Sequence, residues 1–190
     1  MNPNYKKTIK CIINFKRDID KFDPKISHKL IEYIGELYVL YELEKKGFSV
    51  KHKGGQAGFD ILIEKLNKKV EVRTSLLKNE GIYPKNVKYY GWRVKDRNQK
   101  KERKFDIMVD VSLNDRFTKP KFYIFTQKEA YSVGNVNINR FKRVQKKIHL
   151  FETLEAYKLA VKSKPVLVTK FERYINNNQK EFLNKWAKIK

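Results

Sequence analysis

The chain has 190 residues, a formal net charge of +23 and 41 % hydrophobic residues. This length and composition exclude an intrinsically disordered chain and predict a single domain, residues 1–190, with a sizeable core. No apolar run approaches the roughly 20 residues that span a bilayer, and we expect no signal peptide because the first residues form no apolar segment. The single cysteine, Cys11, excludes an internal disulfide, so we expect a protein of the reducing cytoplasm.

The first predicted element is a helix that begins at Asp23-Pro24, where Asp is a favoured N-cap and Pro a favoured first-turn residue. Apolar residues then recur at helical spacing, and Gly47 is the expected C-cap. Glu36 lies in this helix, and its neighbour Gly35 would allow another segment to approach closely. A short strand is expected at 48–51.

Two further strands, at 59–64 and 70–74, alternate between apolar and polar residues, and each carries a carboxylate. Asp60 lies in the first strand, and Glu71 and Arg73 lie in the second, on the side away from its apolar residues. We expect the strands to form an antiparallel pair around a turn. If the connecting loop has an even number of residues, Asp60, Glu71 and Arg73 share one face of the pair.

Carboxylates placed among Ile, Leu and Val are costly to bury unless a positive group compensates for them. A divalent cation is the usual partner of oxygen ligands of this kind. In so basic a chain, a metal held by acidic residues indicates a phosphodiester substrate. Each acid also has a simpler interpretation: Asp60 as a backbone cap, Glu71 as part of a cross-strand ion pair, and Glu36 as a solvated helix residue.

Basic residues are concentrated at 85–104 and 139–147, with aromatic residues among them. This combination is typical of a nucleic-acid surface. A lysine-rich solvated surface and binding to a membrane surface are the alternatives. The residues expected to contact the nucleic-acid backbone are Lys85, Lys88, Arg93, Lys95, Arg97, Lys100, Lys101, Arg140, Lys142 and Arg143.

The order of elements predicts an α/β fold with a mixed central sheet flanked by helices. One strand is expected near 91–94, and clearer strands at 105–113 and 121–126. A helical turn at 127–130 and helices at 151–161 and 166–189 follow. The core is therefore placed at about 24–130 and a helical extension at about 150–190.

Several other polar residues are given no functional role. Asp106 and Asp110 lie on the polar side of the 105–113 strand and are expected to be exposed. The three histidines, His28, His52 and His149, show no ligand spacing and are interpreted as ordinary surface or core residues.

Glu36 in a helix, Asp60 at the start of a strand and Glu71-Val72-Arg73 in the next strand together resemble the PD-(D/E)XK nuclease superfamily. This superfamily includes many type II restriction endonucleases and the archaeal Holliday junction resolvases. The resemblance covers about 26–126 and implies a restriction endonuclease-like core. It also implies that Asp60 and Glu71 bind catalytic Mg²⁺, for which Mn²⁺ substitutes. Glu36 would then help to hold the metal or its water shell, and Val72 would lend its backbone carbonyl.

Arg73 stands at the superfamily's lysine position. Arginine effectively never loses its proton, so the resemblance implies that Arg73 stabilises the scissile phosphate or orients water and is not a general base. Lys69 and Lys78 are nearby candidates for a substitute cation.

Three functions remain open. The first is a Mg²⁺-dependent DNA endonuclease of the type II restriction kind, with no small-molecule cofactor, acting as a homodimer because one small site must cut both strands. The second is a Holliday junction resolvase or other structure-specific nuclease, which fits the size and charge equally well. The third is a DNA-binding protein with weak or no catalysis, for which Arg73 is the sign of lost activity.

Overall fold

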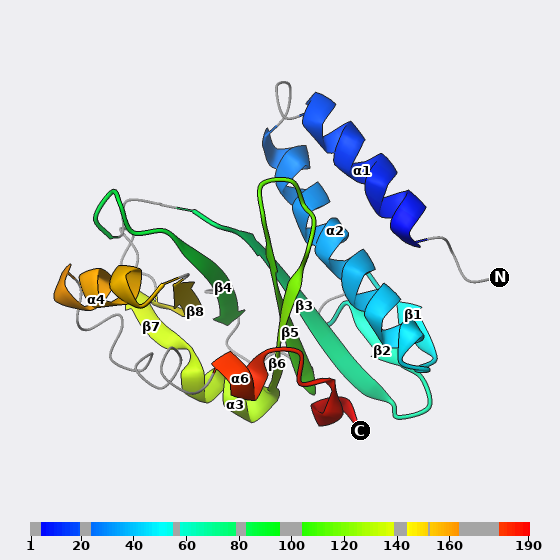
Figure 1. Cartoon of the computed structure of the whole chain (residues 1–190). Helices are drawn as coiled ribbons and strands as arrows, with labels where there is room; N and C mark the ends of the chain where they lie inside the picture. Colours follow the sequence, from blue (N-terminus) through cyan, green and yellow to red (C-terminus); the bar gives the residue numbers. More distant parts are fainter. Residues whose placement is uncertain are drawn as a thin grey trace.

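The computed structural model describes residues 5–19, 24–54, 58–78, 83–95, 104–138, 144–151, 153–163 and 179–190. These residues form a mixed α/β structure in which helices flank a mixed central sheet, as the sequence predicts, and a second, smaller sheet lies beside it (Figure 1). Within those ranges, none of the helices combines the length and the apolar character needed to cross a membrane.

Two helices pack on one side of the central sheet, α1 (Tyr5–Ile19) and α2 (Pro24–Lys45). Helix α2 confirms the predicted helix. It ends where Gly47 adopts a φ of +85°. The Phe48 N–H then donates to the Leu43 carbonyl, which gives a carbonyl of the last turn a hydrogen-bond partner. Helix α1 is not predicted from the sequence. Its buried isoleucines, Ile9 and Ile13, belong to the same apolar cluster as the buried residues of α2.

The central sheet has the strand order β1-β2-β3-β5-β6. Its strands are β1 (Val50–His52), β2 (Ile61–Ile63), β3 (Lys68–Leu76), β5 (Ile107–Leu113) and β6 (Lys121–Thr126). Only β3 and β5 pair parallel, and the other neighbours are antiparallel. The predicted pairing of β2 with β3 and the predicted strands β5 and β6 are therefore confirmed.

The parallel connection from β3 to β5 passes through the second sheet, whose order is β4-β8-β7. This sheet contains β4 (Tyr89–Lys95), β8 (Val144–Phe151) and β7 (Asn135–Ile138), all antiparallel. Of these strands, only β4 is predicted. Its Trp92 donates from the indole nitrogen to the Val111 carbonyl, which ties the second sheet to the central one.

Two predicted helices near the C-terminus are partly wrong. Phe151 closes β8, where it pairs with Tyr89, and helix α4 (Leu154–Ser163) begins later because the Thr153 hydroxyl caps the Ala156 N–H. The first part of the predicted helix at 166–189, as far as residue 178, lies outside the described residues. Beyond that point it is two short pieces, α6 (Gln179–Phe182) and the 3₁₀ turn η3 (Trp186–Ile189).

The break between these two pieces has a local cause. Asn184 takes a φ of +55°, and its N–H bonds to the Phe122 carbonyl of β6 instead of continuing a helix. Helix α3 (Gln127–Val133), in contrast, confirms the predicted helical turn. Its capping box joins the hydroxyl of Thr126 and the carboxylate of Glu129.

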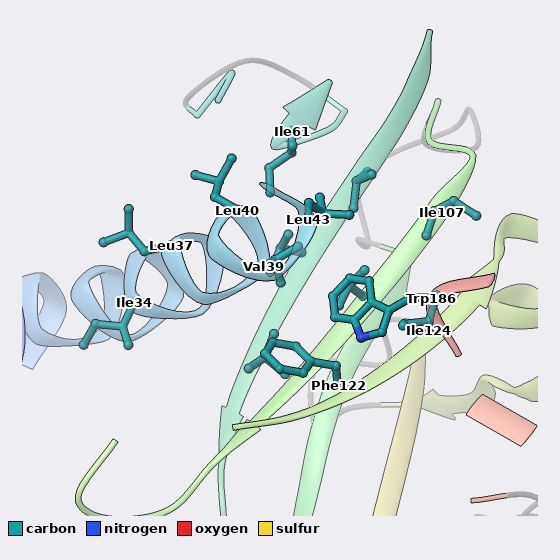
Figure 2. Close-up of a cluster of buried hydrophobic side chains, with 14 of the residues drawn as sticks. Ile34, Leu37, Val39, Leu40, Leu43, Ile61, Ile107, Phe122, Ile124 and Trp186 are labelled. Atoms are coloured by element: carbon teal, nitrogen blue, oxygen red, sulfur yellow. The ribbon is translucent and has the colours of Figure 1, made fainter. Parts of the chain in front are cut away.

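Each face of the central sheet is covered by its own apolar cluster. Figure 2 shows the first cluster, in which Val39 and Leu43 of α2 lie next to the strands, and Trp186 lies beside Phe122 and Ile124. The second cluster joins the opposite face to β4, β8 and α4, largely through aromatic side chains. Because both faces are covered, the central strand β5 is buried along its whole length.

Helix α2 lies close to β3 at Gly35. A Cβ atom at this position would lie 1.8 Å from the Thr74 hydroxyl oxygen, so only glycine permits the observed distance. The expectation that Gly35 allows a close approach is confirmed.

We expect Gly35→Ala to lower the free energy of unfolding by about 1–3 kcal/mol, because the helix must move away from β3. In an unconstrained helix the same change would stabilise by roughly 0.5–1 kcal/mol. Urea denaturation measures the difference, with the exposed Lys29→Ala on α2 as the control. Unchanged or increased stability of Gly35→Ala would contradict the close-packing argument.

Candidate functional site

The pairing of β2 with β3 brings the predicted site residues onto one face. Ile63 pairs with Lys68, so residues 64–67 form a loop with an even number of residues, as the prediction requires. Ile61 pairs with Val70, and continuing this register places Asp60 opposite Glu71. Glu71 and Arg73 point away from the α2 cluster that holds their neighbours Val70 and Val72.

Glu71 is a buried acid that forms an ion pair with Arg73. Burial is the largest influence on this carboxyl and raises the pKa of Glu71 to about 8, while the Arg73 charge opposes the rise. The charges of Asp60 and Glu36 raise the pKa of Glu71 further. The four residues selected from the sequence therefore lie within one electrostatic neighbourhood.

Asp60 is held by the backbone of the adjacent strand. Its Oδ2 accepts a hydrogen bond of 2.7 Å from the Val72 N–H, so its interpretation as a backbone cap describes part of its role. Burial raises the pKa of Asp60, and the Val72 hydrogen bond and the charges of Arg73 and His52 oppose that rise. Asp60 thus lies close enough to Arg73 and His52 for both charges to affect its pKa.

Glu36 reaches the same neighbourhood from α2. Its Oε2 lies 2.6 Å from Nε2 of His52, a residue that ends β1. Burial raises the pKa of Glu36, His52 lowers it and Asp60 raises it again. Glu36 is partly buried, with its side chain 15 % exposed, so it is not the solvated helix acid of the simpler interpretation.

The sequence gives His52 no functional role, yet its ring contacts Glu36 of the candidate site. Gly54 makes room for that ring, since a Cβ there would lie 2.7 Å from His52 Cε1. The glycine-rich segment that follows His52 was the available signal. His28 is exposed on α2, and His149 is a buried residue bonded to the Tyr83 hydroxyl, as expected for ordinary residues.

Asp110 is a second residue that sequence reasoning misplaces. Its side chain is 0 % exposed, and it is the Cα partner of Arg73 across β3 and β5. Burial raises the pKa of Asp110 well above its usual range, and Arg73 opposes this rise. Alternation placed Asp110 on the polar side of its strand, but this side is covered by the second sheet. Asp106 is exposed, as expected.

A cavity of about 530 Å³ opens where α2, β3, β4 and β8 meet. Its lining includes four basic side chains, Arg73, Lys78, Arg93 and Lys147, and one acid, Glu32. Arg73 lies at the boundary, since it faces both this cavity and Glu71. The cavity therefore has a mainly basic lining suited to anions, and it includes Arg73, the ion-pair partner of Glu71.

The predicted nucleic-acid-binding residues fall into three groups. Arg93 is exposed at the cavity, and Lys85 and Lys88 are exposed before β4. Lys95 is the last residue of β4. The others lie outside the described residues: Arg97, Lys100, Lys101, Arg140, Lys142 and Arg143. Lys147 and Lys78, the latter a candidate substitute cation, line the cavity although neither is among the predicted nucleic-acid contacts. Lys69, the other candidate cation, packs over the Phe59 ring.

Among the described residues, no three acidic, histidine or cysteine side chains converge as a group able to hold a metal ion in this arrangement. The three carboxylates are each directed at a protein partner instead: Glu36 at His52, Asp60 at the Val72 amide and Glu71 at Arg73.

We expect the free energy of unfolding to fall as pH rises between 4.5 and about 8, the ordinary and folded-state pKa values of Glu71. Over this range the folded chain keeps a proton that the unfolded chain has lost, so stability decreases. Glu71→Gln should reduce this fall by an amount on the order of a few kcal/mol.

Urea denaturation in EDTA across that pH range makes the measurement, with the exposed Glu64→Gln as the control. A fall of equal size in wild type and Glu71→Gln would contradict the burial argument.

Comparison with protein-family models gives no match to this chain, and comparison with curated proteins gives no significant match.

Proposed function

We propose that this chain is a Mg²⁺-dependent DNA endonuclease of the PD-(D/E)XK superfamily, of the type II restriction kind, with a restriction endonuclease-like core. The observation that carries the proposal is the cluster of Glu36, Asp60 and Glu71, in which Arg73 pairs with Glu71 and also lines a basic cavity. A buried cluster of acids in a chain of charge +23 is costly unless it serves to hold a cation.

The donor set suits Mg²⁺, which prefers carboxylate and carbonyl oxygens. The raised pKa values of Glu36, Asp60 and Glu71 reflect negative charge gathered in a buried place, and a cation relieves that cost. Asp60 and Glu71 are assigned as ligands, with support from Glu36 and the Val72 carbonyl. When bound, the metal would act as a Lewis acid and would lower the pKa of a water molecule.

The protein's own groups position this chemistry. His52 holds the Glu36 carboxylate at 2.6 Å, and the Val72 amide holds Asp60 at 2.7 Å, so both acids have fixed orientations. Arg73 faces the acids on one side and the cavity on the other. Its permanent charge is suited to stabilise the negative charge that grows on a phosphate during hydrolysis.

The basic lining of the cavity supports a nucleic-acid substrate. Lys78, Arg93 and Lys147 come from three separate parts of the chain and line the same cavity as Arg73. Contacts of this type neutralise backbone phosphates and give affinity without sequence choice. A homodimer is proposed because a duplex requires two cuts.

We expect Asp60→Asn and Glu71→Gln each to reduce cleavage at least about 100-fold, since each change weakens cation binding at the reacting phosphate. DNA binding should remain, because the basic wall is unchanged. The assay uses supercoiled plasmid and a synthetic four-way junction, each with Mg²⁺ and with EDTA, and Asp115→Asn is the matched control on an exposed loop.

Discrete plasmid fragments that require Mg²⁺ would support the restriction assignment, whereas cleavage of the junction alone would assign the chain to the resolvases. Binding without cleavage of either substrate would favour the inactive DNA-binding protein. Full activity of either variant would refute the site assignment.

We expect Arg93→Gln to weaken DNA binding several-fold and to lower the slope of log affinity against log salt by about one, the effect of losing a single phosphate contact. Fluorescence anisotropy with a labelled duplex at several salt concentrations measures both quantities. Arg116→Gln, which removes an exposed arginine outside the cavity lining, is the control. An equal loss in both variants would mean that the cavity has no special role.

A further inference from the structure

Arg73 lies between two buried carboxyl groups that belong to different strands. Glu71 is two residues earlier on β3 and forms the ion pair with Arg73. Asp110 is the Cα partner of Arg73 on the neighbouring strand β5, on the same face of the sheet. Paired strands lie about 4.8 Å apart, so the long arginine side chain spans the distance to either acid.

The present arrangement leaves one of these acids unsatisfied. Both carboxyl oxygens of Asp110, and the Nε of Arg73, are buried and have no hydrogen-bond partner among the described residues. A buried polar group without a hydrogen bond is destabilising, by roughly 1–3 kcal/mol. If Arg73 turned to Asp110, the guanidinium and the carboxylate would satisfy each other and the Glu71 carboxylate would be released.

We propose that Arg73 exchanges partners on cation binding: it pairs with Glu71 in the cation-free protein and moves to Asp110 when a divalent cation takes the Glu71 carboxylate. Asp110 is then a positioning residue, which acts through Arg73. This inference rests on the proposed metal site.

The physical reason is that a buried guanidinium keeps its charge and requires an anion. Arg73 and the cation compete for the same carboxylate, so cation binding displaces a positive group that has to be accommodated nearby. Asp110 is a fully buried acid in register with Arg73, and its electrostatic environment already includes that arginine. The exchange therefore links binding of the cation by the acidic cluster to the position of the Arg73 guanidinium.

The test is a calorimetric titration of Mn²⁺ into the full chain and four variants. Arg73→Gln removes the competitor and should tighten Mn²⁺ binding by about tenfold, and Asp110→Asn removes the alternative partner and should weaken it by about tenfold. In the double variant, Asp110→Asn should have no further effect, because Arg73 is no longer there to be relocated. Asp115→Asn, an equal change of charge on an exposed loop, should leave affinity unchanged.

The double variant separates this exchange from simple long-range electrostatics, which predicts additive effects of the two substitutions. Additive effects, or unchanged affinity in Asp110→Asn, would overturn the exchange while leaving the proposed metal site in place. Absence of Mn²⁺ binding by the wild-type chain would overturn the metal site and the exchange together. If Asp110→Asn fails to fold, as judged by near-UV circular dichroism, unchanged affinity in Arg73→Gln alone still refutes the exchange.

Discussion

The candidate site depends on the alternation of side chains along β3. Val70 and Val72 point into the apolar cluster beneath α2, so Glu71, Arg73 and Ser75 point to the other face. Ser75 accepts the Gly91 N–H from β4, which shows that this polar face is covered and not solvated. A slip of one residue would bring two charges into the apolar cluster, and this cost holds the register in place.

Burial governs the chemistry of the acids. It is the largest influence on the pKa values of Glu36, Asp60, Glu71 and Asp110 and raises all four. Arg73 opposes the rise for three of them, Asp60, Glu71 and Asp110. A lysine in this place would be able to lose its proton in such surroundings, whereas the arginine keeps a permanent charge that the surrounding acids must share.

The second sheet supplies the other half of the site. The parallel pairing of β3 with β5 requires a long connection, and here that connection contains β4, which packs across the polar face with β8 beside it (Figure 1). The cavity that results joins Arg73 to Lys78, Arg93 and Lys147. An arrangement that begins as a topological requirement thus places basic side chains next to the acidic cluster.

The sequence by itself determined α2 and the antiparallel pair of β2 and β3, because these features follow from local periodicity. It placed Asp60, Glu71 and Arg73 on one face only for a connecting loop with an even number of residues, and the structure decided that condition. The close approach at Gly35 also followed from residue type. Only the tertiary structure decided the environments of Asp110 and His52. Asp110 is buried because a second sheet, formed by strands from before and after it in the chain, covers its face. His52 meets Glu36 because a helix and a strand cross there. Contacts between distant segments leave no periodic signal in either segment, so alternation predicts which face a residue occupies but not what covers that face.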